Sequence, residues 1–189
     1  MNTKLIPMLF SLPLLFSQQY LAAADADPAQ LKQEAVRIVK KFGGSLKPEL
    51  KQAIQSGGPA HAISVCAEKA PEIARGLSNE TGWMVKRVSL KARNRQSATP
   101  DAWEREVLEQ FDRRQAAGEP ASQMVHSEVV GGEFRFMKAQ AVEAVCMNCH
   151  AAKVKPEVET ALRENYPDDK ARGYTLGQVR GAFSLTRDL

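Results

Sequence analysis

The segment Gln123–Ala139, which reads QMVHSEVVGGEFRFMKA, predicts a β-hairpin and with it much of the fold. Gly131-Gly132 is a two-residue connection of the kind that joins paired antiparallel strands, where positive φ angles are required. In that register one face of the hairpin, expected to meet the core, carries Val125, Val129, Phe134 and Phe136. The opposite face, expected to point away from the core, carries Met124, His126, Glu128, Arg135 and Met137.

The flanking sequence supplies further elements. Strands are predicted over 83–90 and 178–185, where β-branched or alternating apolar residues recur. Helices are predicted to begin at Asp27-Pro28, at Pro59 and at Asp101, and to run over 155–165. We expect Gly43-Gly44 to weaken or end the first helix and Gly57-Gly58-Pro59 to form the next break. The sequence therefore predicts one α+β domain over residues 25–189, with N-terminal helices and an antiparallel sheet.

A five-residue motif follows the hairpin directly. Cys146-Met147-Asn148-Cys149-His150 has the C-x-x-C-H spacing of a c-type haem attachment site. Two thiols join the two vinyl groups of one porphyrin, and the adjacent imidazole then reaches the iron as an axial ligand. A zinc site would need further ligands nearby, and a redox dithiol would leave the histidine unexplained. We therefore expect one covalent haem c. A cytochrome c′-like helix bundle is the alternative fold, but the Gly-Gly hairpin argues against it.

The N-terminus has the three parts of a secretory signal in order. Lys4 precedes an apolar run over 5–16, and Ala22-Ala23-Ala24 offers a cleavage site. The run is too short to span a bilayer. We expect a signal peptide over residues 1–24, cleavage near Ala24 and a periplasmic protein without a membrane span. Covalent haem attachment belongs to the same exported compartments, so the two predictions support each other.

Charge narrows the possible partners. The full chain has 26 Lys and Arg against 22 Asp and Glu, and the signal removes one lysine, so the mature charge is 25 minus 22, or +3. This modest, scattered excess argues against a nucleic-acid partner. We also expect no enzymatic activity, because no His/Arg pair stands at a spacing recognisable for peroxidase chemistry.

A second axial ligand has to come from earlier in the chain, because no Met, His or Cys follows His150. The candidates are His61, Cys66, Met84, Met124, His126 and Met137. Cys66 lies on the apolar face of its predicted helix with Ile63 and Ala70, and is the odd cysteine of an exported chain. By spacing alone, a buried apolar cysteine and a ligand are equally good interpretations.

Several stretches resemble a known family. They are 63–71 (ISVCAEKAP), 87–94 (RVSLKARN), 100–104 (PDAWE), 146–150 (CMNCH), 166–171 (YPDDKA) and 181–184 (GAFS). The sequence is similar to the monohaem c-type sensor domains first described in cyanobacteria, whose fold is PAS-like. That resemblance implies His150 as the proximal and Cys66 as the distal iron ligand. Relatives usually have Asn-Pro where this chain has Asn94-Arg95.

Two functions follow as hypotheses. Thiolate ligation would give a low potential, and release of the thiolate would open a position for CO or NO, which suits a redox or gas sensor acting through a separate protein. The alternative is a low-potential electron-transfer cytochrome. Arg87, Arg93 and Arg95 are candidates for contacting the haem propionates, since arginine pairs well with carboxylates. A solvated basic loop is an equally good interpretation of these residues.

Overall fold

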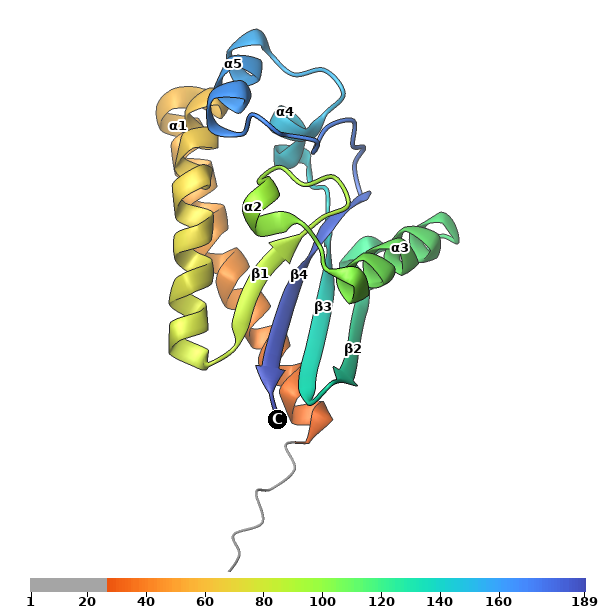
Figure 1. The fold of residues 1–189 in the computed structure, drawn as a ribbon. Helices are drawn as coiled ribbons and strands as arrows, with labels where there is room; N and C mark the ends of the chain where they lie inside the picture. Colours follow the sequence, from red (N-terminus) through yellow and green to blue (C-terminus); the bar gives the residue numbers. More distant parts are fainter. Residues whose placement is uncertain (1–26) are drawn as a thin grey trace, which may run out of the picture.

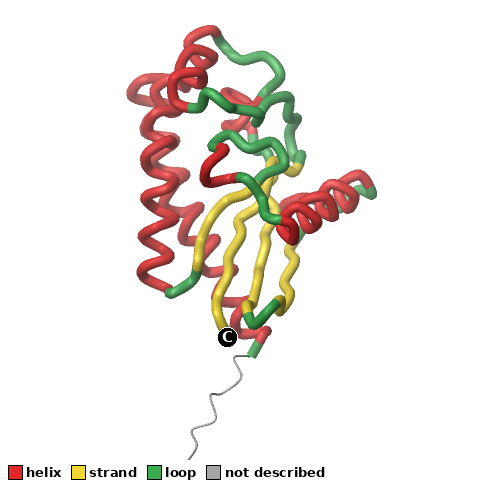
Figure 2. The backbone as a smooth tube through the Cα atoms, viewed as in Figure 1, coloured by secondary structure: helices red, strands yellow, loops and turns green. Residues whose placement is uncertain are grey.

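A computed structural model describes residues 27–189, so the predicted signal peptide lies outside the described part of the chain. Within that part the strands form one antiparallel sheet in the order β1-β4-β3-β2. The strands are β1 (Met84–Val88), β2 (Val125–Val130), β3 (Glu133–Ala141) and β4 (Val179–Asp188). Figure 2 shows this sheet with helices around it, which confirms the predicted α+β class.

The predicted hairpin is β2 and β3. Its turn is Gly131-Gly132, with φ angles of 61° and 85°, and Val129 pairs with Phe134. The expected division into faces is confirmed, but the expectation that one face points away from the core is wrong. Met124 and Met137 on that face are 0% exposed, because helix α3 packs over it. The sheet is therefore buried on both sides.

Helix α1 (Pro28–Thr81) is a pair of antiparallel arms. Gly58, at φ 76° and ψ 179°, breaks the helical backbone between them, as predicted. Figure 1 shows the first arm behind the sheet and the second returning beside β1. Lys41 and Glu80, one from each arm, form an ion pair.

The expected break at Gly43-Gly44 does not occur. The helix continues through both glycines, because their neighbour Phe42 is 1% exposed in the core on the α1 side of the sheet and Leu46 packs against the same core. Glycine costs a helix interior only about 1 kcal/mol relative to alanine. Burial of one large side chain contributes more than that.

The remaining helices lie on the second face of the sheet and around its end. Helix α3 (Ala102–Ala116) begins after Asp101, as predicted, and Asp101 and Glu104 form a capping box there. The short helices are α2 (Arg95–Ala98), η1 (Ala121–Gln123), η2 (Ala144–Cys146), α4 (Met147–His150) and α5 (Pro156–Asn165). Helices α4 and α5 lie beyond the upper end of the sheet in Figure 1, next to the turn of α1. Across residues 27–189, every helix is too short or too polar to cross a membrane.

Candidate functional site

The C-x-x-C-H motif lies at the end of the sheet. The chain leaves β3, passes through η2 and forms the single turn of α4, which carries Cys149 and His150. Cys146 and Cys149 are free thiols of intermediate exposure. Both thiols and His150 line a cavity of about 1030 Å³ between α1, the sheet and α4. As the motif predicts, Cys146, Cys149 and His150 therefore line the same cavity.

His150 is held in one tautomer. Its Nδ1 lies 2.8 Å from the carbonyl oxygen of Ala171, and because a carbonyl only accepts, Nδ1 carries the proton. The ring is 8% exposed, and burial together with Arg180 and Arg93 lowers the pKa of His150 to about 2. The imidazole is therefore neutral, and its Nε2 lone pair is free to bind a metal. Tyr174 packs edge-on against it, with ring centroids 6.0 Å apart.

Cys66 lies on the second arm of α1 and lines the same cavity as His150. Burial raises the pKa of the Cys66 thiol, while the positive charges of Arg87, Arg93 and Arg180 act in the opposite direction and favour the thiolate. The cavity wall near Cys66 is therefore positively charged.

The structure separates the other candidate ligands from this cavity. Met124 and Met137 lie in the core under α3, and Met84 is 61% exposed and outside the cavity lining. His126 lies beside Trp103 and Glu128 on the α3 side of the hairpin. His61 is exposed on α1 and also lies outside the cavity lining. Of the six candidates, the structure brings only Cys66 to the cavity that holds His150.

Arg93 is fixed by protein groups. Its guanidinium donates to both carboxylate oxygens of Asp169, at 3.2 and 3.3 Å, and to the carbonyl oxygens of Cys149 (2.6 Å) and Ala171 (3.3 Å). Asp169 also binds Arg172. Arg93 therefore links the loop between β1 and α2 to the backbone of the C-x-x-C-H motif. The sequence offered no signal for this network beyond the similarity of the 166–171 stretch.

Asn94 and Arg95 account for the departure from the Asn-Pro pattern. Asn94 caps α2 by accepting hydrogen bonds from the amides of Gln96 (3.1 Å) and Ser97 (3.3 Å). Arg95 is the first residue of α2, the position at which proline is also well tolerated. The conformation of Asn94-Arg95 is therefore one that an Asn-Pro pair could also adopt. Arg95 is exposed and lies outside the cavity lining.

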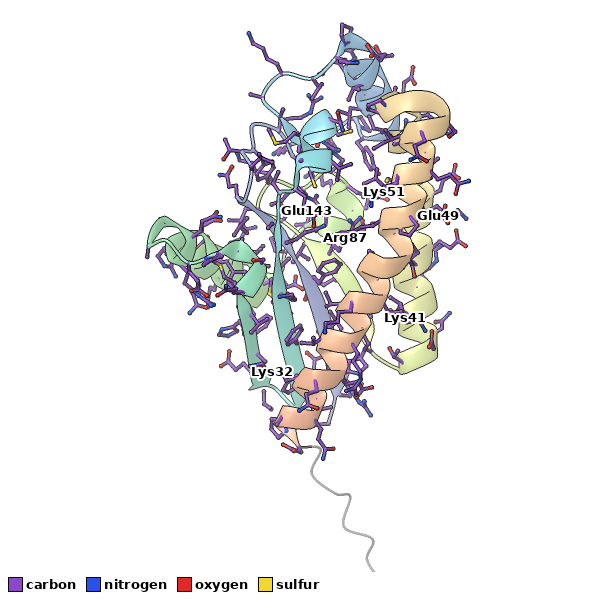
Figure 3. All side chains as sticks on the ribbon, turned by 180° about the vertical axis from the view of Figure 1, so that it is seen from behind. Lys32, Lys41, Glu49, Lys51, Arg87 and Glu143 are labelled. Atoms are coloured by element: carbon purple, nitrogen blue, oxygen red, sulfur yellow. The ribbon has the colours of Figure 1, made fainter. Side chains whose placement is uncertain are left out.

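Three further arginines line the cavity: Arg75 on the second arm of α1, which is exposed, and Arg87 on β1 and Arg180 on β4, which are half-buried. Figure 3 shows Arg87 between the sheet and the first arm of α1, and its guanidinium carbon lies 5.3 Å from the ring centroid of Phe42. Arg180 was missed by sequence reasoning, although it directly precedes the 181–184 stretch that carries part of the resemblance. Both half-buried side chains add positive charge to the wall.

The cavity suits a large, flat, partly acidic group better than a bare metal ion. Its walls include apolar side chains such as Val39, Ile63 and Phe183 alongside the arginines. Among residues 27–189, no three His, Cys, Asp or Glu side chains gather as a metal-ion site would require. A porphyrin supplies the four equatorial nitrogens itself, so that His150 and Cys66 would be sufficient protein ligands.

Comparison with known proteins identifies the family of this chain. No curated protein matches its sequence. The crystal structure of the cyanobacterial haem protein Tll0287 has a similar fold, with a TM-score of 0.66 and 24% identity over 86% of this chain and 97% of that one. The model of the Tll0287-like family matches residues 17–187. The family indicated by the short sequence stretches is therefore confirmed: the chain belongs to the Tll0287-like family.

Proposed function

We propose that the chain is an exported monohaem c-type protein that acts as a redox or gas sensor, with His150 and Cys66 as the iron ligands. The observation that carries this proposal is that both thiols of the motif, His150 and Cys66 line one cavity. The solved relative is described as a haem protein, which supports the same cofactor here.

Attachment would use the thiols of Cys146 and Cys149. Each thiol adds across one vinyl group, with sulfur bonding to one carbon and the hydrogen passing to the other, so no electrons are gained or lost. Expression with a cytochrome c maturation system should give a protein whose mass is raised by one haem and that retains haem after denaturation. Cys146→Ser with Cys149→Ser should lose the retained haem. Wild-type protein matured without haem would contradict the proposal.

Haem, when bound, supplies one-electron chemistry and a position for a diatomic gas. Cys66 would act as the switch, because a thiolate ligand favours the oxidised state and its release frees that position. The low-temperature EPR spectrum of the oxidised protein should show a low-spin thiolate–imidazole signal that Cys66→Ala abolishes. The reduced wild-type protein should take up CO. Reduced protein that keeps both protein ligands and excludes CO would contradict the sensor.

Electron transfer is the second candidate function, and one observation favours it. Basic side chains are frequent around the cavity, including Lys40, Lys47, Lys91 and Lys138. Such a rim would attract an acidic redox partner and accelerate its association at low salt. A bimolecular electron-exchange rate that falls steeply with ionic strength, in a reduced protein that excludes CO, would favour this function over the sensor.

A further inference from the structure

Arg180 is a half-buried cation without an anion. Its Nε is buried and has no hydrogen-bond partner. Within residues 27–189 its guanidinium forms no ion pair, although arginine carries five N–H donors. Leaving a charged donor desolvated and unpaired costs free energy. A side chain retained in this condition indicates a partner that comes from outside the chain.

A β-bulge directs this side chain. Gln140 pairs with Gly181 and Ala141 with Val179, so Arg180 is the extra residue that β4 carries against β3. Bulges of this kind are known to re-aim side chains next to functional sites. Here the bulged residue lines the cavity that His150 and Cys66 share.

The bulge is fixed on both sides. The hydroxyl of Ser89 donates to the carbonyl oxygen of Arg180 at 2.6 Å, and the hydroxyl of Tyr174 donates to it at 3.3 Å. A Cβ at Gly181 would lie 2.4 Å from the carbonyl oxygen of Val88, so only glycine allows this approach of β4 to the end of β1. The backbone thus holds Arg180 in place before any ligand arrives.

Arg87, also half-buried, is a second arginine of the cavity wall without an anionic partner. Burial lowers the pKa of Arg87 to about 10, and the positive charge of Arg180 adds to this effect. In the described part of the chain neither guanidinium is paired with a carboxylate. Glu143 is the one acidic residue among those that line the cavity, and its carboxylate is occupied by Lys47 at 2.6 Å. The cavity wall therefore has an excess of positive charge that the protein does not neutralise.

Arg93, which the sequence also offered as a propionate contact, is in a different position. Its Nε and Nη2 already donate to Asp169 and to the carbonyl oxygens of Cys149 and Ala171. Arg75, a further lining arginine, is exposed to solvent, so the half-buried arginines without an anion are Arg180 and Arg87.

We propose that Arg180, together with Arg87, binds the carboxylates of the haem propionates and selects the acidic porphyrin. This inference rests on the proposed haem c function and adds a role that the sequence did not assign. Arginine forms short, often bidentate hydrogen bonds with carboxylates, so two carboxylates satisfy the donors that the apoprotein leaves unpaired. Arg93 keeps its role in holding the motif.

The first test uses the haem-loaded protein. In Arg180→Leu and in Arg87→Leu, the propionate-bending band of the resonance Raman spectrum should shift and the reduction potential should fall, because a positive charge that favours the reduced state is removed. Arg180→Lys should restore the potential more fully than the Raman band. Arg95→Leu, a basic residue outside the cavity, is the matched control and should change neither. A band and potential in Arg180→Leu equal to those of wild type would overturn the proposal.

The second test separates this proposal from the proposed function. The variant Cys146→Ala with Cys149→Ala, checked for folding by circular dichroism, is titrated with ferric protoporphyrin IX and with its dimethyl ester, which lacks carboxylates. Binding of the free acid should be about tenfold tighter or more, and Arg180→Leu should remove most of that preference. Equal binding of acid and ester would overturn the role of Arg180 and leave haem binding intact. Binding of neither, with no haem attached to the wild type, would overturn both.

Discussion

The guanidinium of Arg93 links three segments that are far apart in the sequence: the basic loop, the C-x-x-C-H turn and the stretch around Asp169. Both side chains of its ion pair with Asp169 are largely buried: Arg93 is 16% exposed and Asp169 is 6% exposed. Without Arg93, Asp169 keeps Arg172 but loses its other cation, and the carbonyl oxygen of Cys149 loses this donor. We therefore expect Arg93→Ala to lower the free energy of unfolding of the apoprotein by about 2 kcal/mol, measured by urea denaturation.

Two variants define what Arg93 contributes. Arg93→Lys keeps the charge but loses the fork, so it should recover only part of the loss. Arg95→Ala, two residues away and exposed, should stay within about 0.5 kcal/mol of the wild type. If Arg93→Ala were as stable as Arg95→Ala, the hydrogen bonds of Arg93 would not contribute to the stability of the fold.

Residue by residue, the sequence predicted the attachment motif but not the residues that support it. Cys146, Cys149 and His150 are contiguous, so their spacing carries their chemistry. Cys66 could only be placed among six candidates, because choosing among them requires knowing which face meets which helix. Arg180 could not be found at all, since a bulge changes the direction of a side chain and leaves no periodic pattern.

At the scale of elements, α1 depends on the one residue that breaks it. Gly58 has a backbone conformation that is essentially restricted to glycine, and it reverses the helix so that Cys66 returns along the sheet. Gly58→Ala should lower the free energy of unfolding by about 2 kcal/mol. Gly76, in a regular helical position with open space around it, is the matched control. Gly76→Ala should raise the stability by about 0.5–1 kcal/mol. Equal effects at both glycines would show that the hinge is not strained.

Helix α3 is attached to the sheet by a buried carboxylate. Glu104 is 0% exposed and accepts hydrogen bonds from Ser184 on β4 (2.6 Å) and from the amide of Asp101 (2.9 Å), and Lys86 on β1 lies 2.9 Å from it. Glu104→Ala should lower the free energy of unfolding by about 3 kcal/mol, because the buried hydroxyl of Ser184 loses its acceptor and the partly exposed ammonium of Lys86 loses its partner.

Chemical denaturation of Glu104→Ala beside Glu106→Ala tests this attachment. Glu106 is exposed on the same helix, so its removal should cost no more than about 0.5 kcal/mol. Similar losses in the two variants would mean that Glu104 does not hold α3. The sequence predicted this helix and its start at Asp101, but it did not predict that the helix covers the second face of the hairpin. Alternation alone assigns one face of the hairpin to the core, and the polar residues on the second face, such as Arg135, conceal that this face is covered too.

For the whole molecule, the position of the cavity predicts which parts respond to haem. Its lining comes from both arms of α1, from β1, β3, β4 and α2, and from the Glu143–His150 segment. Helix α3 (Ala102–Ala116) contributes no residue to that lining and packs on the other face of the sheet. A covalent haem would therefore join elements that in the apoprotein face one another across a space of about 1030 Å³.

Hydrogen exchange should reveal this division. Comparing the haem-loaded protein with Cys146→Ser, Cys149→Ser, we expect exchange to slow by about tenfold or more in the α1 segment around Cys66, in 88–98 and in 142–150, because local opening of these segments would have to break contacts with the haem. Amides of α3 that exchange through local fraying should be unchanged, which makes α3 an internal control. Slowing that is confined to α3, or equal there and around Cys66, would mean that haem lies somewhere other than the cavity that Cys66 and His150 share.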